Sequence, residues 1–107
     1  MSEVERGAQA GEGREASSDP PEVTAALERL WTSRDQEDFE PIHRYFFPVL
    51  RDFFLSRGLL EGEAPELAQE ALLRAWSNLD NFRGDGAFAA WIGRIGANLW
   101  KNILRDD

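Results

Sequence analysis

Two stretches of the chain decide the fold: residues 64–76, APELAQEALLRAW, and residues 88–99, FAAWIGRIGANL. In both, apolar residues recur every three or four positions, which is the period of a helix with one buried face. Pro65 marks the start of the first helix, which we expect to end near Ser77. The segment between them, residues 79–86 (LDNFRGDG), is rich in turn-forming residues. The pattern predicts two amphipathic helices joined by one polar loop.

Helical patterns also occupy the chain on both sides of this unit. Upstream, Asp19-Pro20-Pro21 is typical of a helix start, with a capping acid followed by proline in the first turn, and the helix is expected to run to about Trp31. A second helix is predicted over residues 36–57, with Pro48 producing a kink or dividing it in two. The last helix is predicted over residues 87–105.

Apolar residues never alternate over a useful length, so no strand is supported. The predicted fold class is all-α, a small helical bundle of about four helices.

The composition is that of one small domain with a modest core. Of 107 residues, 42% are hydrophobic and 11% aromatic. Residues 1–18 contain almost no large apolar side chain, so we expect a disordered N-terminal tail followed by one helical domain over residues 19–107. The chain has no cysteine, which excludes disulfides, zinc–thiolate sites and cysteine nucleophiles. Neither a signal-peptide pattern nor an apolar run of membrane-spanning length occurs, so the expected location is cytoplasmic.

The net charge of −8 argues at first against a nucleic-acid partner. The charge is unevenly distributed. Residues 1–40 hold eleven acids against four arginines, a net −7, whereas residues 83–105 hold four basic residues against one acid, a net +3. The acidity therefore belongs to the front of the chain, and a nucleic-acid role for the last helix stays open.

Enzymatic chemistry is not expected. His43 is the only histidine, and metal sites or acid–base catalysis usually need a second histidine or converging carboxylates. Gly84-Asp85-Gly86 matches no phosphate-binding motif. We therefore predict no catalytic residue, no metal and no cofactor, and a surface position for His43.

One side of the helix over residues 64–77 carries polar residues: Glu66, Gln69, Glu70 and Arg74. Two interpretations remain open. This side is either an ordinary solvated face with a Glu70–Arg74 pair four residues apart, or a docking face for a basic helix of a partner.

The last predicted helix likewise has an apolar side and a polar side. Phe88, Ile92, Ile95 and Leu99 share a stripe that we assign to the core, whereas Trp91 and Trp100 lie where an aromatic ring could stack on an unpaired base. The opposite side is either a solvated face or a strand-binding face, with positive charge for phosphates and amides for base edges; it consists of Arg94, Asn98, Lys101, Asn102 and Arg105. Gly93 and Gly96 either permit a close helix crossing or weaken the helix.

Taken in order, these segments resemble region 2 of the sigma-70 family, most closely its extracytoplasmic-function (ECF) group. The resemblance covers about residues 25–105 and rests on APELAQE with LRAW (residues 64–70 and 73–76) and FAAWI with RI and Asn98 (residues 88–98). Upstream, Phe39-Glu40 and Tyr45 with Pro48 also fit. Order and spacing make the resemblance specific.

The resemblance implies a transcription initiation domain that binds core RNA polymerase through the clamp helices of its largest subunit. The polymerase-binding residues would be Glu66, Gln69, Glu70, Leu73 and Arg74. It also implies recognition and melting of the minus-ten promoter element, with the non-template strand held single and a flipped base cradled by the loop over residues 78–86. The DNA-binding residues would be Asn78, Asp80, Asn81, Phe82, Arg83, Trp91, Arg94, Asn98, Lys101 and Arg105.

The sequence departs from the family pattern at several points. Pro65 and Glu66 stand where two acidic residues are usual, Gly93 and Gly96 replace bulkier residues, and the chain ends at Asp107 without the second domain that binds the minus-thirty-five element. These departures leave alternatives open: a helical adaptor that binds polymerase or an anti-sigma factor without reading DNA, or a helical bundle with no nucleic-acid partner.

Overall fold

The computed structural model of the chain describes residues 19–82, 84 and 86–106, and over these residues it contains helices and no strand. The predicted tail, residues 1–18, lies outside the described residues. The elements are α1 (Pro21–Ser33), a 3-10 turn η3 (Gln36–Phe39), α2 (Glu40–Ser56), α3 (Glu63–Ser77), a second 3-10 turn η4 (Leu79–Asn81) and α4 (Phe88–Asp106). The prediction of an all-α bundle of about four helices is confirmed.

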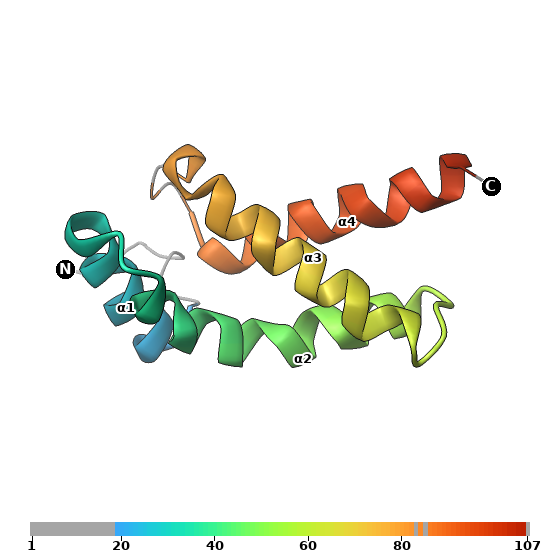
Figure 1. Ribbon diagram of the computed structural model, residues 1–107, viewed down its shortest axis with the longest axis horizontal. Helices are drawn as coiled ribbons and strands as arrows, with labels where there is room; N and C mark the ends of the chain where they lie inside the picture. The colour runs from blue at the N-terminus through green and yellow to red at the C-terminus, as the bar shows by residue number, and fades with distance from the viewer. Residues whose placement is uncertain (1–18, 83, 85, 107) are drawn as a thin grey trace, which may run out of the picture.

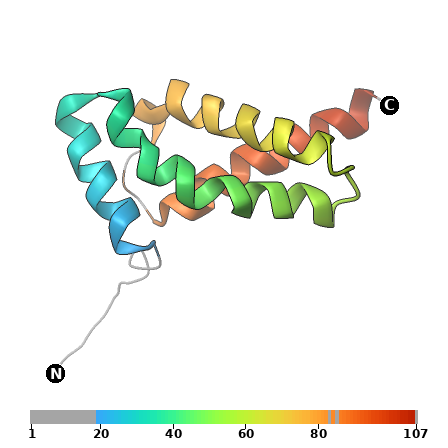
Figure 2. The same cartoon turned by 60° about the horizontal axis from the view of Figure 1, so that its bottom comes forward.

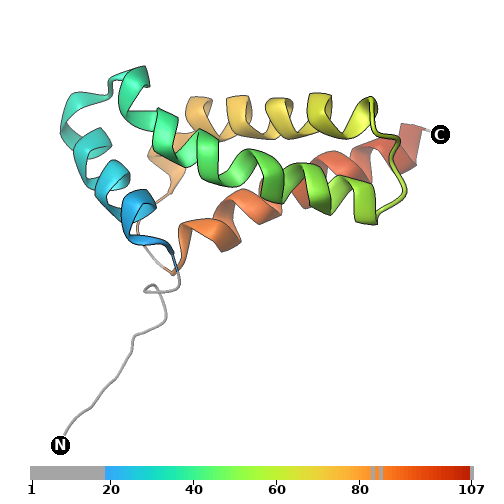
Figure 3. The ribbon, with the colours of Figure 1, turned by 90° about the horizontal axis from the view of Figure 1, so that it is seen from below.

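Helices α2, α3 and α4 run successively antiparallel, and α1 closes one end of the group (Figure 1). Turned by 60°, the structure shows α2 and α3 side by side with α4 behind them (Figure 2). From below, α1 lies across the end at which α4 begins (Figure 3). This arrangement places α1 beside the segment between α3 and α4.

The core is built from the stripes that the helical period predicts. Its largest fully buried side chains are Phe46, Phe54, Phe88, Leu30, Ile42, Leu72, Leu79, Ile92 and Val23. On α3 the buried face consists mainly of alanines: Ala64, Ala68, Ala71 and Ala75. Such small side chains let the α3 backbone approach α2 and α4 closely. Of the predicted α4 core, Phe88, Ile92 and Leu99 are buried, and Ile95 is partly buried against them.

Helix α2 does not divide at Pro48, which lies inside the continuous helix. The break comes earlier, where η3 ends at Phe39 and α2 begins at Glu40. Pro41 fits there because the first turn of a helix has no partner for its N–H. Of the two predicted outcomes, a kink or a division at Pro48, the division is therefore wrong.

Asp19 does not cap the helix that follows it. The residue before α1 is Pro20, and no side chain caps α1. The Asp19 carboxylate instead accepts hydrogen bonds from the backbone N–H groups of Phe88, at 2.7 Å, and Ala89, at 3.1 Å. Ala87, the residue before α4, has no side-chain acceptor, so the first N–H groups of α4 receive theirs from Asp19.

In the part of the chain that the structure describes, no helix is both long and apolar enough to cross a bilayer.

Candidate functional site

The outer side of α4 carries an ordered polar stripe. Trp91, Arg94, Asn98 and Lys101 follow one another at spacings of three or four residues and therefore lie on one side of the helix. Arg94, Asn98 and Lys101 are exposed, and Trp91 is half-buried. Arg105 continues the stripe by its place in α4, but its side chain lies outside the description. The two exposed cations and the Asn98 amide form one row along α4.

The row begins beside the segment that joins α3 to α4. There Asn78 donates from Nδ2 to the carbonyl oxygen of Arg74 at 2.9 Å, which satisfies the end of α3. Asp80 forms an ion pair with Arg34, and Asn81 is exposed. Arg83, the remaining cation predicted here, lies outside the described residues. Asn78, Asp80 and Asn81 are thus exposed on the segment that precedes α4.

Phe82 is placed in the core, with 7% of its surface exposed. Its ring meets Phe88 edge-on at 5.1 Å between ring centroids, lies 5.6 Å from Trp91 and stacks on Trp31 at 6.4 Å. A ring in this position cannot present its face to a base without leaving the core. Phe82 therefore packs in the core beneath the loop. Of the aromatic residues in this cluster, Trp91 is the one that lies on the polar stripe.

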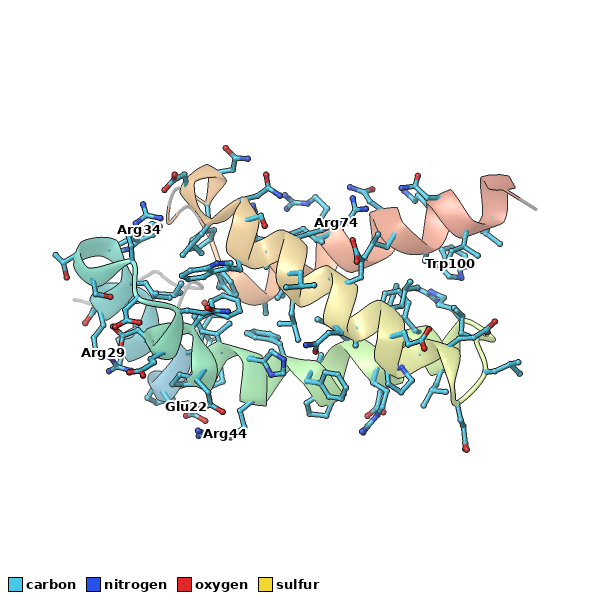
Figure 4. All side chains as sticks on the ribbon, viewed as in Figure 1. Glu22, Arg29, Arg34, Arg44, Arg74 and Trp100 are labelled. Atoms are coloured by element: carbon cyan, nitrogen blue, oxygen red, sulfur yellow. The ribbon has the colours of Figure 1, made fainter. Side chains whose placement is uncertain are left out.

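Arg34 belongs to the same region, although nothing in the sequence pattern pointed to it. It ends α1 in the left-handed conformation, with φ 54°, and its N–H donates to the carbonyl oxygen of Leu30. Its guanidinium lies 5.6 Å from the ring centroid of Trp31 and pairs with Asp80. Figure 4 shows Arg34 at the α1 end of the molecule, where α1 turns into η3. A cation thus reaches the loop from a helix distant in sequence.

The outer side of α3 carries the residues that were predicted to bind polymerase. In the structure these residues differ in their exposure and in their partners. Glu70 and Arg74 form the expected pair, with Arg74 Nε 3.0 Å from Glu70 Oε2. Glu66 is exposed on the α4 side, and Leu73 has 53% of its surface exposed. Gln69 faces α2, where His43 Nε2–H donates to its Oε1 at 3.1 Å.

His43 is therefore not an isolated surface residue. It is only partly exposed, stacks on Phe47 at 5.8 Å between ring centroids and links α2 to α3 through Gln69. Its partner is one of the predicted polymerase-binding residues, so His43 orients that residue from the neighbouring helix. Helical spacing alone gave no sign of this contact.

Trp100 lies at the other end of α4 and is engaged within the molecule. The Arg57 guanidinium lies 4.8 Å from the ring centroid of Phe53 and 5.4 Å from that of Trp100. In Figure 4, Trp100 points from α4 toward the ends of α2 and α3. A groove opens beside it, lined by Arg57, Gly58, Leu59, Glu63, Glu66, Leu67, Glu70, Trp100, Ile103 and Leu104.

The described residues hold no group of three or more histidine, aspartate or glutamate side chains that could bind a metal ion. The arrangement instead offers exposed faces with hydrogen-bonding and charged groups.

Residues 49–107, more than half of the chain, match the family described as Sigma-70 region 2. The chain belongs to this family, a domain of transcription initiation factors and not of enzymes. The matched part contains the second half of α2, all of α3, the loop and α4, and so includes every predicted site residue.

Individual relatives agree with this assignment. The chain is similar to the ECF RNA polymerase sigma-E factor of Escherichia coli (strain K12), with 46% identity over 50 residues, which are 47% of this chain and 26% of that protein. It is also similar to the RNA polymerase sigma-H factor of Pseudomonas aeruginosa, with 52% identity over 42 residues, 39% of this chain and 22% of that protein. The similarity thus spans about a quarter of these relatives. No solved structure matches the chain.

Proposed function

We propose that residues 19–107 form a transcription initiation domain that binds core RNA polymerase and recognises and helps to melt the minus-ten promoter element. The observation that carries this proposal is the family match, which spans both the outer side of α3 and the polar stripe of α4. Two exposed faces on adjacent antiparallel helices allow one domain to hold two partners at the same time.

The polymerase-binding face consists of Glu66, Gln69, Glu70, Leu73 and Arg74 on α3. Leu73, with more than half of its surface exposed, supplies an apolar contact between charged neighbours. In interfaces of this kind a central apolar residue contributes affinity, and the surrounding charges contribute specificity for the partner. The proposed partner is the pair of clamp helices of the largest polymerase subunit.

The DNA-binding face consists of the loop and the outer side of α4. Arg94 and Lys101 would pair with phosphates, Asn98 would reach base edges, and the open side of Trp91 would stack on an unpaired base. Asn78, Asp80, Asn81 and Arg83 would surround a flipped base, and Arg105 would extend the phosphate contacts. Phe82 is proposed to act beneath the loop rather than on DNA, because its ring is buried.

Fluorescence anisotropy with a minus-ten non-template oligonucleotide tests the DNA-binding face. We expect binding that weakens as salt is raised, because phosphate pairing releases counterions. Arg94→Ala should weaken it and reduce the salt dependence by about one unit of slope. The matched control is Arg44→Ala, which removes an exposed arginine of α2 that pairs with Glu40. An equal loss in both variants would contradict the assignment to α4.

A pull-down with the polymerase clamp helices tests the polymerase-binding face. Glu70→Lys reverses a charge and places two cations side by side, since Arg74 loses its partner. We expect this variant to lose binding while keeping its helical circular dichroism. Glu28→Lys makes the same charge change at an exposed position of α1 and should bind as the wild type does. Failure of the wild-type chain to bind would overturn the polymerase assignment.

The alternative function, an adaptor that binds polymerase or an anti-sigma factor without reading DNA, is favoured by the net charge of −8. The same two measurements separate it from the main proposal. Clamp-helix binding without any oligonucleotide binding at low salt, tested also in the presence of core polymerase, would identify the adaptor.

A further inference from the structure

Helix α1 lies outside the part of the chain that matches the family, yet residues at its two ends contact the elements on either side of the proposed DNA-binding loop: η4 and the first turn of α4. The two contacts come from opposite ends of α1. With 13 residues, α1 is about 20 Å long. One rigid helix therefore spans the segment that connects α3 to α4.

The N-terminal contact is made by Asp19, two residues before α1 begins at Pro21. Its two carboxylate oxygens accept from Phe88 N–H at 2.7 Å and from Ala89 N–H at 3.1 Å, in the first turn of α4. A carboxylate also interacts favourably with the positive end of the helix dipole. Phe88 is fully buried, and its ring centroid lies 5.3 Å from that of Trp91. Asp19 thus holds the turn that carries Trp91.

The C-terminal contact is made by Trp31 and Arg34. Trp31 stacks on Phe82, the residue that follows η4, and Arg34 pairs with Asp80 inside η4. Arg34 adopts the left-handed conformation directly after α1, and its guanidinium reaches Asp80 in the loop. The start of the loop is therefore held by one end of α1, and the start of α4 by the other.

We propose that α1 is a two-point brace that holds the loop and the first turn of α4 in the geometry that binds the minus-ten strand, with Asp19 as its principal positioning residue. This inference rests on the proposed function for the choice of ligand. Asp19 does not contact DNA in this scheme. It fixes the N-terminus of α4, and through Phe88 it fixes Trp91.

Asp19→Ala and Asp19→Asn test the brace in the full chain. The alanine variant removes both acceptors, and the asparagine variant keeps one carbonyl oxygen, so it should restore part of the effect. Asp35→Ala is the matched control, because Asp35 also caps a helical turn by accepting from the Glu37 N–H at 3.0 Å, but that turn is η3.

Amide hydrogen exchange measured by NMR tests directly whether Asp19 protects the first N–H groups of α4. In Asp19→Ala, exchange at Phe88 and Ala89 should accelerate at least tenfold, while α3 amides keep the wild-type rate. Asp19→Asn should fall between the two, and Asp35→Ala should match the wild type at α4. Unchanged exchange at Phe88 and Ala89 in Asp19→Ala would overturn the brace, whatever the DNA result.

Affinities for the minus-ten oligonucleotide and for the clamp helices then test whether this protection matters for DNA binding. Asp19→Ala should bind the minus-ten oligonucleotide about five- to tenfold more weakly, while its affinity for the clamp helices stays unchanged. A general loss of folding would instead lower both affinities and would contradict a positioning role. A wild-type chain that binds no oligonucleotide overturns the proposed DNA function. A wild-type chain that binds, with an Asp19→Ala variant of equal affinity, overturns the brace alone.

Discussion

Gly96 of α4 faces Leu50 of α2 so closely that a Cβ added to the glycine would lie 3.1 Å from Leu50 Cδ2. The next nearest atom, Phe54 Cζ, would lie at 3.7 Å. Gly93, one turn earlier in α4, has no neighbouring atom within 4 Å of the same position. The two glycines of α4 therefore lie in different surroundings: Gly96 permits a close helix crossing, whereas Gly93 faces open space.

Gly96→Val should destabilise the domain by about 1–3 kcal/mol, because the added methyl groups must displace Leu50 or Phe54 in a packed core. Urea unfolding followed by circular dichroism measures the change. Gly93→Val is the matched control, since it makes the same change where nothing is displaced. Equal losses in the two variants would contradict the close crossing at Gly96.

Gly93→Ala should stabilise the domain by about 0.5–1 kcal/mol, because alanine restricts the unfolded chain and fits an exposed helical position without contact. For a domain of this size that corresponds to a rise in melting temperature of roughly 2–8 °C. Scanning calorimetry is the measurement. A fall in melting temperature would mean that the backbone at Gly93 is not the open helical site described above.

Phe82→Ala should destabilise the domain by about 3–5 kcal/mol, as truncation of a buried aromatic ring does. Leu60→Ala removes an exposed apolar side chain, with 68% of its surface open, and should change stability by less than about 0.5 kcal/mol. Chemical unfolding of both variants provides the comparison. If Phe82→Ala keeps the wild-type stability, the Phe82 ring does not belong to the core. Phe82 would then again be a candidate for direct contact with DNA.

His43 and Gln69 should be energetically coupled through the hydrogen bond that joins α2 to α3. A double-mutant cycle with His43→Ala and Gln69→Ala should give a coupling free energy of about 0.5–1.5 kcal/mol. Unfolding of the two single variants, the double variant and the wild type supplies the four values. Strict additivity would mean that the hydrogen bond contributes nothing to stability.

The helices and most of the core were predictable because they are local in sequence. A residue such as Ile92 lies on the buried side of its helix by its spacing from Phe88 and Leu99, whatever the rest of the molecule does. Trp31 shows the limit of this reasoning: by helical spacing it lies near Leu27 and Leu30, which are buried, yet 42% of its own surface is exposed.

The contacts that organise the candidate site were not predictable, because they join residues distant in the chain. Asp19 carries the sequence signature of a cap for its own helix, and its real partners lie 69 and 70 positions away. The same holds for Arg34, which meets Asp80 only because α1 lies across the loop. Phe82 looked like a loop residue, and only the packing of Phe88 beneath it reveals that it is buried.

The family assignment begins at Val49, but the interactions that keep the assigned part in shape begin at Asp19. Phe46, three residues before that boundary, packs its ring 5.7 Å from Phe88 between centroids, and Trp31 covers Phe82. A fragment cut at the boundary would lose all three contacts and leave the first turn of α4 uncapped. The segment that matches the family is therefore shorter than the segment whose contacts hold the first turn of α4 in place.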